Sequence, residues 1–464
     1  MTQETPQTPQ APQAQQLPCT PLMRRIVLER GQRLTEALLE RSGGIDAAVE
    51  DAARAIVEDV RDRGDAALRE YTARFDGVTL DDFRVTPAEI AAAYARVDDR
   101  LLEALRVCAA RIRDFHERQV QQSWFTTPRE PGRAGVLLGQ QVTPIRRVGI
   151  YAPGGRADYP SSVLMNVVPA VVAGVEEIAV TAPPNASGTL VASTLVAADL
   201  SGATEIYKMG GAQAVAAFAY GTRSIAAVDK ITGPGNAYVA AAKKLVQGTV
   251  GIDLIAGPSE VLILADDTAD ARLVAIDLMA QAEHDPRAAT YLVTTEPTLP
   301  DAVERELDQL LRKTTRADIT RAALEDNSVA LVCADLSDAL AASNLIAPEH
   351  LEVLTREPLA LLSRITNAGA IFLGPWTPEA VGDYSAGPNH TLPTQGTARF
   401  SSPLTVDDFV KKSSVLYYTA DALRGEAGDV MTLAAAEGLW AHGEAARLRV
   451  EGGGADGGTG GDAS

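Results

Sequence analysis

The sequence predicts an α/β protein with two Rossmann-like parallel-sheet domains, each incomplete and doubly wound, and with helical arms at both ends. Short apolar strands alternate with glycine-rich loops and helices over residues 150–257, which is typical of a doubly wound sheet. A second strand–helix alternation begins at residue 258 and continues to a strand over Gly369–Leu373. Helical apolar periodicity precedes the first set and follows the second.

The N-terminal part is predicted to be mostly helical. Residues 1–20 are polar and rich in Pro and Gln, so we expect a disordered extension there. Residues 21–45 are expected to form a helical arm, and an amphipathic helix is predicted from Asp46 to Arg74. Thr86-Pro87-Ala88-Glu89 has the pattern of a capping box with Pro at the first helical position, which predicts a further helix.

Four loops of the first set present glycines where strands end, as in Ala152-Pro153-Gly154-Gly155 and Gly233-Pro234-Gly235. Nucleotides bind at such places in open parallel sheets, on backbone N–H groups and helix N-termini. The fingerprint GxGxxG is absent, because Asn236-Ala237-Tyr238 follows Gly235. Tight turns would explain the same glycines, so the loops alone leave both interpretations open.

A predicted helix closes on Gln281-Ala282-Glu283-His284-Asp285. Gln281 and His284 are three residues apart and therefore share one helix face. An amide oxygen and an imidazole on one face make half of a metal site. The alternative is a polar helix C-terminus in which His284 faces the negative end of the helix dipole.

The stretch Ala347-Pro348-Glu349-His350 is a second candidate for chemistry. Pro348 suits the first position of a helix, which would separate Glu349 and His350 by about 100° around its axis. The two side chains would then face one substrate from two sides. Histidine suits general acid–base work, and the carboxylate beside it could activate water. The alternative is an ordinary acidic helix start with a surface histidine.

Two further pairs are weaker on their own. Asp383 and His390 lie in a long segment rich in Gly, Pro and Thr over residues 374–402, and such loops are usually functional. Turn chemistry would also explain these residues. Glu437 and His442 are five apart, so a bend or a helix end would be needed to bring them to one site.

Charge and cysteine usage restrict the class of protein. The chain carries 61 acidic and 42 Lys or Arg residues, a net charge of −19, which argues against nucleic acid or an anionic membrane as partner. We expect no membrane span, because no apolar run is long enough. The three cysteines form no CxxC pair, and the first residues lack a signal-peptide pattern. A cytoplasmic location is therefore expected.

Taken in order, these motifs resemble the L-histidinol dehydrogenase family. The resemblance runs from about residue 21 to 449, and many motifs in one order make it specific. It rests on Tyr151-Ala152-Pro153-Gly154-Gly155, Gly210-Gly211-Ala212-Gln213, Gly233-Pro234-Gly235-Asn236, Ala256-Gly257-Pro258-Ser259-Glu260, Gln281 to Asp285, Ala347 to Glu352, Gly382 to His390 and Glu437 to His442.

The resemblance implies a cytoplasmic enzyme of histidine biosynthesis that oxidises L-histidinol to L-histidine through L-histidinaldehyde, with two NAD molecules used in succession. It implies one Zn²⁺ per subunit and His350 as the base that takes the alcohol proton. Glu349 matches the residue that activates water on the aldehyde. The residues matching the zinc ligands are Gln281, His284, Asp383 and His442. Those matching substrate contacts are Ser259, Gln281, His284, His350, Asp383, Glu437 and His442, with His390 nearby, and those matching NAD contacts are Tyr151, Gln213 and Asn236.

The resemblance also implies a domain plan. Residues 46–149 and 258–402 would form a catalytic zinc domain, and residues 150–257 the NAD-binding domain. Residues 403–450 would form a helical dimerisation segment, exchanged in a homodimer so that Glu437 and His442 reach the partner's site, before a disordered tail at 451–464. A zinc hydrolase would use the same ligands but leave the glycine loops idle. Intact Glu349 and His350 argue against an inactive binding protein.

Overall fold

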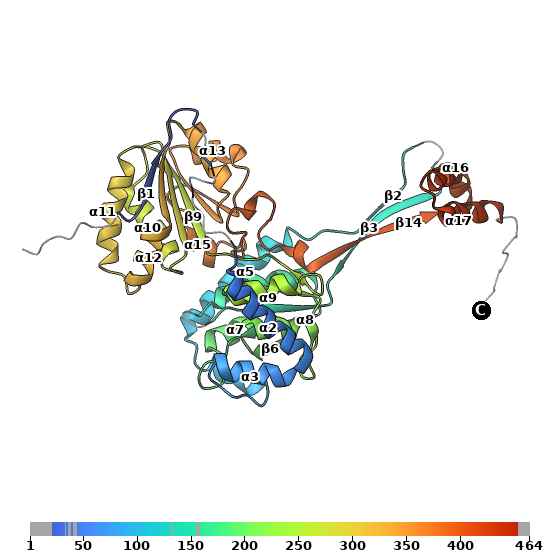
Figure 1. Ribbon diagram of the computed structural model, residues 1–464, viewed down its shortest axis with the longest axis horizontal. Helices are drawn as coiled ribbons and strands as arrows, with labels where there is room; N and C mark the ends of the chain where they lie inside the picture. Colours follow the sequence, from blue (N-terminus) through green and yellow to red (C-terminus); the bar gives the residue numbers. More distant parts are fainter. Residues whose placement is uncertain are drawn as a thin grey trace, which may run out of the picture.

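The computed structural model of the 464-residue chain describes residues 21–32, 34–35, 39, 44–130, 133–154 and 158–452. Two parallel sheets with helices on their faces form the body, and a long arm projects from it (Figure 1). The predicted α/β class with two parallel sheets is therefore confirmed. The predicted disordered extension lies outside the described residues, as does nearly all of the predicted tail. No helix in the described ranges is long and apolar enough to cross a membrane.

The first sheet is all parallel, with the order β6-β5-β4-β7-β8. The chain starts at the centre, moves to one edge, then returns to the other side of β4, so the switch point lies between β4 and β7. Successive residues of β5 face opposite layers: Ile178 and Val180 pack in one apolar core and Ala179 in the other. Its strands are β4 (Arg147–Tyr151), β5 (Glu177–Ala182), β6 (Glu205–Lys208), β7 (Lys230–Thr232) and β8 (Gly251–Ile252).

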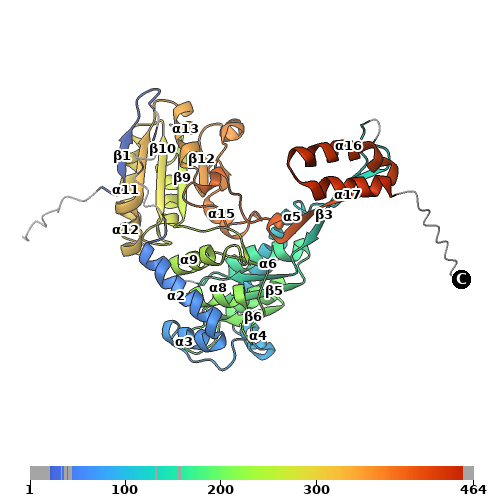
Figure 2. The same cartoon turned by 45° about the vertical axis from the view of Figure 1, so that its right-hand side comes forward.

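Helices from two parts of the chain cover the first sheet. Those between its strands are α6 (Pro160–Ala173), α7 (Ala192–Ser201), α8 (Gly211–Tyr220) and α9 (Ala237–Val246). Those from the N-terminal part are α2 (Ala47–Arg63), α3 (Asp65–Phe75), α4 (Pro87–Tyr94) and α5 (Asp99–Glu117). Figure 2 shows α2 lying along α8 and α9.

This packing corrects the expectation that residues 46–149 belong with 258–402. The apolar face of α2, with Ala53, Ile56 and Val60, is buried against α8 and α9 of the first sheet. An amphipathic pattern predicts that a helix face is buried, but it does not specify the partner. The predicted single helix over Asp46–Arg74 is also two helices, because the chain turns at Gly64 with φ 55°.

The second sheet repeats the same order and adds one strand at its edge. Its order is β1-β11-β10-β9-β12-β13, again all parallel. The helices α10 (Ala271–Ala282), α11 (Leu299–Leu311) and α12 (Ala317–Asn327) cover one face, and α13 (Leu336–Ile346) covers the other. Its strands are β1 (Arg24–Val27), β9 (Glu260–Ala265), β10 (Ala289–Thr294), β11 (Ser328–Val332), β12 (His350–Leu354) and β13 (Ala370–Leu373).

Two helices predicted for this region are strands. Within residues 21–45, β1 pairs in register with β11, so the expectation of a helical arm is wrong at Arg24–Val27. Residues 348–350 do not begin a helix either. Helix α13 ends at Ile346, Ala347 adopts a left-handed conformation with φ 48°, and His350 opens β12. In both places a neighbouring strand supplies the backbone hydrogen bonds, and local periodicity does not reveal that neighbour.

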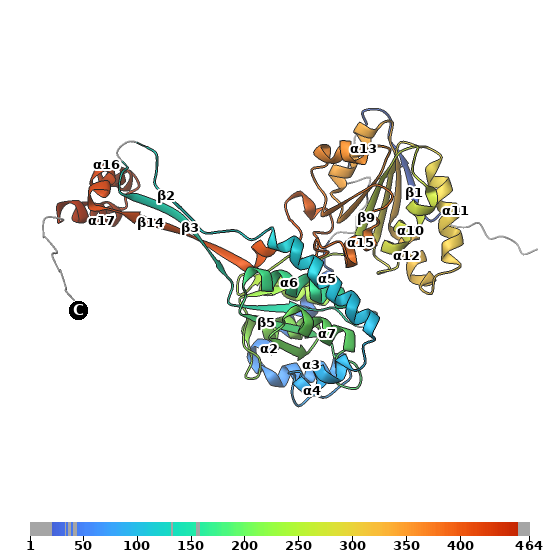
Figure 3. The same cartoon turned by 180° about the vertical axis from the view of Figure 1, so that it is seen from behind.

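The arm is an antiparallel ribbon that ends in a helical hairpin, well away from both sheets (Figures 1 and 3). Strand β14 (Val410–Tyr418) pairs with β3 (Val136–Pro144) along its whole length, and β2 (Trp124–Thr126) pairs with β3 on the other side. Helices α16 (Ala420–Ala436) and α17 (Trp440–Glu451) pack together at the tip. The segment 403–450 is therefore α-helical only in its second half, because β3 supplies β14 with its hydrogen bonds.

Candidate active site

A cavity of about 540 Å³ lies between the two sheets. The first sheet contributes the loop after β7, with Pro234, Gly235 and Asn236. The second sheet contributes the residues at the beginnings of β9 and β12, together with the end of α10 and the short helix α15 (Glu379–Tyr384). The cavity thus brings together segments that lie more than a hundred residues apart in the sequence.

Glu349 and His350 are both tied to the backbone of Glu260, the first residue of β9. The Glu260 N–H donates to Glu349 Oε2 at 2.9 Å, and the Glu260 carbonyl lies 3.0 Å from His350 Nδ1. Strands β9 and β12 are neighbours in register, with His350 opposite Val261. The two candidate catalytic side chains are therefore fixed by one residue's backbone on the neighbouring strand.

The hydrogen bond to the carbonyl fixes the tautomer of His350. A carbonyl oxygen only accepts, so Nδ1 carries the proton and Nε2 keeps its lone pair. Nε2 is buried without a hydrogen-bond partner in the described part of the chain, and it lies 3.9 Å from Asp383 Oδ1. Burial lowers the pKa of His350 from 6.5 to about 4. A neutral imidazole with a free lone pair is the form that a general base needs.

Burial shifts the pKa of Glu349 upward, whereas it shifts that of His350 downward. Only 6% of Glu349 is exposed, and burial raises the pKa of its carboxyl well above the usual range, with Glu260 and Asp383 adding repulsion. The Glu260 N–H acts in the other direction by stabilising the carboxylate. A carboxylate with a raised pKa is a stronger base than an exposed one, which suits the activation of water.

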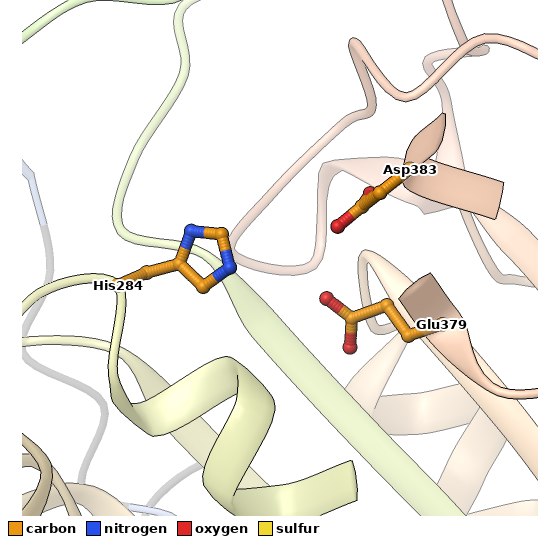
Figure 4. Close-up of side chains that lie close together, drawn as sticks. All are labelled: His284, Glu379 and Asp383. Atoms are coloured by element: carbon orange, nitrogen blue, oxygen red, sulfur yellow. The ribbon is translucent and has the colours of Figure 1, made fainter. Parts of the chain in front are cut away.

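His284, Glu379 and Asp383 bring one ligand atom each to within 4.8 Å of one another (Figure 4). His284 follows the end of α10, while Glu379 and Asp383 lie one turn apart on α15, so they share a helix face. Burial, followed by repulsion from Asp383 and Glu349, raises the pKa of Glu379 well above the usual range. Nitrogen and carboxylate oxygen together are a donor set that fits zinc and other divalent ions.

Gln281 supports this cluster from α10. It is 1% exposed and borders the cavity. With its amide nitrogen toward β9 and α15, it donates to the Glu260 carbonyl and to Glu379 Oε1, each at 3.2 Å. That orientation leaves the amide oxygen on the opposite side, available to a ligand of the cavity. Sequence reasoning missed Glu379, although its position four residues before Asp383 was a signal for a shared helix face.

His390 and Ser259 also line the cavity. His390 Nε2 lies 3.2 Å from Ser162 Oγ, and its Nδ1 lies 3.0 Å from the Asp383 carbonyl. Burial lowers the pKa of His390, so it too is held neutral. His390 therefore links the first turn of α6, on the first sheet, to α15 on the second.

The three residues matched to NAD contacts lie around the glycine loops of the first sheet. Asn236 borders the cavity and caps α9, its Oδ1 accepting from the N–H groups of Tyr238 and Val239. Tyr151 is 3% exposed, and its hydroxyl accepts from the Gly211 N–H at 3.1 Å. Gln213 is 1% exposed, and neither of its amide atoms has a hydrogen-bond partner in the described structure.

Glu437 and His442 do not join the cavity within one chain. Glu437 caps the end of α16, Gly438 turns the chain with φ 72°, and His442 lies in the first turn of α17. Both side chains are exposed at the tip of the arm, remote from the sheets (Figure 3). The helix end that this spacing requires is present, but the pair faces solvent.

Comparisons with known proteins agree with this picture. The family model of histidinol dehydrogenase matches residues 39–450. A histidinol dehydrogenase of Geobacillus kaustophilus is 54% identical over 88% of this chain and 96% of its own length. One from Geobacter sulfurreducens is 52% identical over 89% and 96%. The crystal structure of histidinol dehydrogenase from Elizabethkingia anophelis superposes with a TM-score of 0.87 at 36% identity, covering 94% of this chain and 99% of that one.

The family match covers the first sheet, every residue that lines the cavity, nearly all of the arm and the second sheet except its edge strand β1. The chain belongs to the histidinol dehydrogenase family.

Proposed function

We propose that this enzyme oxidises L-histidinol to L-histidine through L-histidinaldehyde, with NAD as the oxidant of both steps and one zinc ion in the cavity. The observation that carries the proposal is the Glu260 backbone, which holds a neutral base and a carboxylate beside a cluster of metal-ligating side chains. An alcohol oxidation needs the first, and an aldehyde oxidation needs the second.

For the metal, we assign the amide oxygen of Gln281, the imidazole of His284 and a carboxylate oxygen of Asp383 as ligands. Their chemistry fits a divalent ion, and the carboxyl of Glu379 lies beside His284 and Asp383. His442 of the partner subunit is our fourth ligand. When bound, the zinc ion would orient the substrate through its nitrogen donors, and NAD would accept the hydride of each step.

The chain's own groups then divide the proton transfers. His350 takes the alcohol proton on Nε2, the lone pair that its bond to Glu260 leaves free. Glu349 takes a proton from the water that adds to the aldehyde. Ser259 and His390 border the same space and contact the substrate in our assignment. Burial of both catalytic side chains keeps competing water away from the reacting carbon.

For NAD, we assign residues 150–257, with Tyr151, Gln213 and Asn236 at the site. The loop Gly233-Pro234-Gly235 lies at the switch point of the first sheet and leads into the N-terminus of α9. A helix N-terminus carries partial positive charge and suits a pyrophosphate. Two hydrogen bonds fix the backbone of Gly233: its N–H donates to Asp253, and its carbonyl accepts from Lys243.

We further propose a homodimer that exchanges its arms, so that Glu437 and His442 complete the partner's cavity. The arm exposes large apolar side chains, which is unusual for a surface that stays in water. They include Phe125, Leu416, Tyr417, Leu433, Trp440 and Leu448. A cytoplasmic location is part of the proposal, since Cys108 and Cys333 are free thiols. Neither nucleic acid nor a membrane is assigned as a partner.

The deciding experiment is a stoichiometry. Zinc-loaded protein is mixed with L-histidinol and excess NAD, and nicotinamide reduction is followed to completion. We expect two NADH per histidinol, with activity abolished by a chelator and restored by zinc. One NADH would mean that the aldehyde escapes and that Glu349 does not activate water for the second oxidation. No NADH would contradict the proposed reaction.

A further inference from the structure

A buried carboxyl that the proposed reaction does not use lies directly beside the site. Glu352 belongs to β12 and is 1% exposed. It follows His350 by two residues, so both side chains point to the same face of the second sheet. That face is covered by α10, because Leu354, the next residue on this face, packs with the apolar side chains of α10. An ionisable group in such a place is costly unless its polar atoms are satisfied.

One oxygen of Glu352 holds α15. Its Oε1 accepts the backbone N–H of Glu379, the first residue of α15, at 2.7 Å. The residue at the cap position of α15 is Pro378, whose side chain makes no capping hydrogen bond. A carboxyl from a neighbouring strand therefore does what a capping side chain of the helix itself would ordinarily do.

The other oxygen faces α10. Glu352 Oε2 is buried and has no hydrogen-bond partner among the described residues, and the carboxyl of Asp277 on α10 is close enough to interact with it. Two carboxyls bond to each other only when one of them carries a proton. Burial, followed by repulsion from Asp277, raises the pKa of Glu352 to about 8. A neutral Glu352 that donates from Oε2 to Asp277 accounts for both observations.

Each of the three elements joined in this way carries an assigned site residue. Asp277 and Gln281 are four apart on α10 and share a face. Helix α15 carries Asp383, and β12 carries His350. His350 Nε2 lies 3.9 Å from Asp383 Oδ1, and His350 Nδ1 lies 3.7 Å from Glu379 Oε1. These spacings change if α15 moves relative to β12.

We propose that Glu352 is a positioning residue: its carboxyl joins α10 and α15 to β12, and so sets the places of Gln281 and Asp383 relative to His350. This inference rests on the function proposed above. Glu352 touches neither substrate nor metal in it.

The test compares two replacements. In Glu352→Gln the amide oxygen accepts from Glu379 and the amide nitrogen donates to Asp277, so both bonds remain. In Glu352→Met a side chain of similar length loses both. We expect zinc affinity and kcat within about twofold of wild type for the first, and a loss of about tenfold or more in both for the second, in line with disrupted support of metal ligands. Zinc affinity is measured by competition with a chromophoric chelator, without substrate.

Asp266 provides a matched control. It is a buried carboxyl at the opposite end of β9, and it accepts the Arg356 N–H at 2.8 Å just beyond β12. Asp266→Leu should lower the melting temperature as Glu352→Met does, yet leave zinc affinity unchanged. Equal zinc loss in both variants would mean general loosening and would overturn the proposal. Wild-type zinc affinity and turnover in Glu352→Met would overturn it too, as would a Glu352→Gln enzyme as impaired as Glu352→Met.

A second pair of variants covers the case in which Glu352→Met does not fold. Asp277 is only half-buried on α10, so Asp277→Asn and Asp277→Leu change one side of the junction. Asn keeps a polar partner for Glu352, and Leu removes it. We expect weaker zinc binding in the Leu variant only, and equal binding in both would overturn the inference. Wild-type protein that binds zinc but yields no NADH would instead contradict the proposed function, so the two failures are distinguishable.

Discussion

The two sheets share the strand order 3-2-1-4-5 but turn opposite ends toward the cavity. The first sheet presents the carboxyl ends of its strands, with the loop after β7 and the N-termini of α6 and α9. The second presents the amino ends of β9 and β12 and the C-terminus of α10. Open α/β sheets ordinarily bind ligands at the carboxyl ends, so the second sheet is the exception.

The difference has an electrostatic consequence. Helix N-termini carry partial positive charge and C-termini partial negative charge. The first sheet therefore presents the positive ends of helices to the cavity, which suits a phosphate group. The second presents the negative end of α10, with Gln281 and His284, which suits a cation. At the amino end of β9, the N–H of Glu260 donates to Glu349. In the proposed function, the same strand order serves nucleotide binding in one sheet and metal binding in the other, because the two sheets present opposite ends to the cavity.

The largest effect is expected at the second sheet, in His350→Gln. Loss of a positioned general base should lower kcat for alcohol oxidation by about 10²–10⁴-fold. Stopped-flow measurement with histidinol and with histidinaldehyde separates the steps. His116→Gln is a matched control, because His116 is also fully buried with Nδ1 on a backbone carbonyl, but lies on α5. A kcat near wild type in His350→Gln would show that His350 is not the general base.

Glu349→Gln should separate the two steps. The amide can still accept from the Glu260 N–H but cannot take a proton, so aldehyde oxidation should fall by about 10²-fold or more. Alcohol oxidation should change much less, since it needs no activated water. Single-turnover NADH formation from each substrate measures both. Equal losses would show that Glu349 acts on something common to the steps.

Asp383→Ala should specifically weaken metal binding. We expect zinc affinity and turnover to fall together, the former by about ten- to a hundredfold, comparable with losses seen when metal-site groups are removed. Zinc per chain is measured by mass spectrometry after dialysis. Asp285→Ala, which removes an acidic side chain paired with Arg287 at the same cavity, is the control. Full zinc occupancy in Asp383→Ala would make Asp383 a substrate contact only.

Gly233→Ala should weaken NAD binding and leave metal binding unchanged. Gly233 has φ 108°, and a Cβ there would lie 2.1 Å from the Tyr151 carbonyl oxygen, so the loop must shift. We expect the KM for NAD to rise about tenfold, a cost of about 1.4 kcal/mol, with zinc affinity unchanged. Gly248→Ala has the same strain at φ 100° but open space around it. A rise of KM in both variants would attribute the effect to strain alone.

The smallest expected effect is a shift of the acid limb of the pH–rate profile for alcohol oxidation to lower pH. His350 must be neutral to accept a proton, and burial lowers its pKa to about 4. Alcohol oxidation should therefore persist as the pH falls through 6.5 and decline only toward about pH 4. The value of kcat/KM for histidinol reports the free enzyme, with zinc content measured at each pH. If the acid limb lies near the ordinary histidine pKa while zinc is retained, the base is exposed to solvent.

Elements with a local signal could be predicted from the sequence alone. The apolar runs of β4, β5, β9, β10 and β11 predicted buried parallel strands, because such strands are apolar on both faces. Ordered motifs identified Gln281, His284, Glu349, His350 and Asp383 as candidates, and the structure brings these five side chains to one cavity. Their roles in binding and catalysis stay predictions.

Which elements pack together could not be predicted from the sequence and follows from the three-dimensional structure. Strands β1, β12 and β14 are strands because a neighbour supplies their hydrogen bonds, and α2–α5 cover the first sheet because that is where an apolar face is unoccupied. The end of the second sheet that meets the cavity, and the buried carboxyls Glu352 and Glu379, follow from long-range packing. Periodicity within a segment reports that a face is buried, but it contains no information about the partner that buries it.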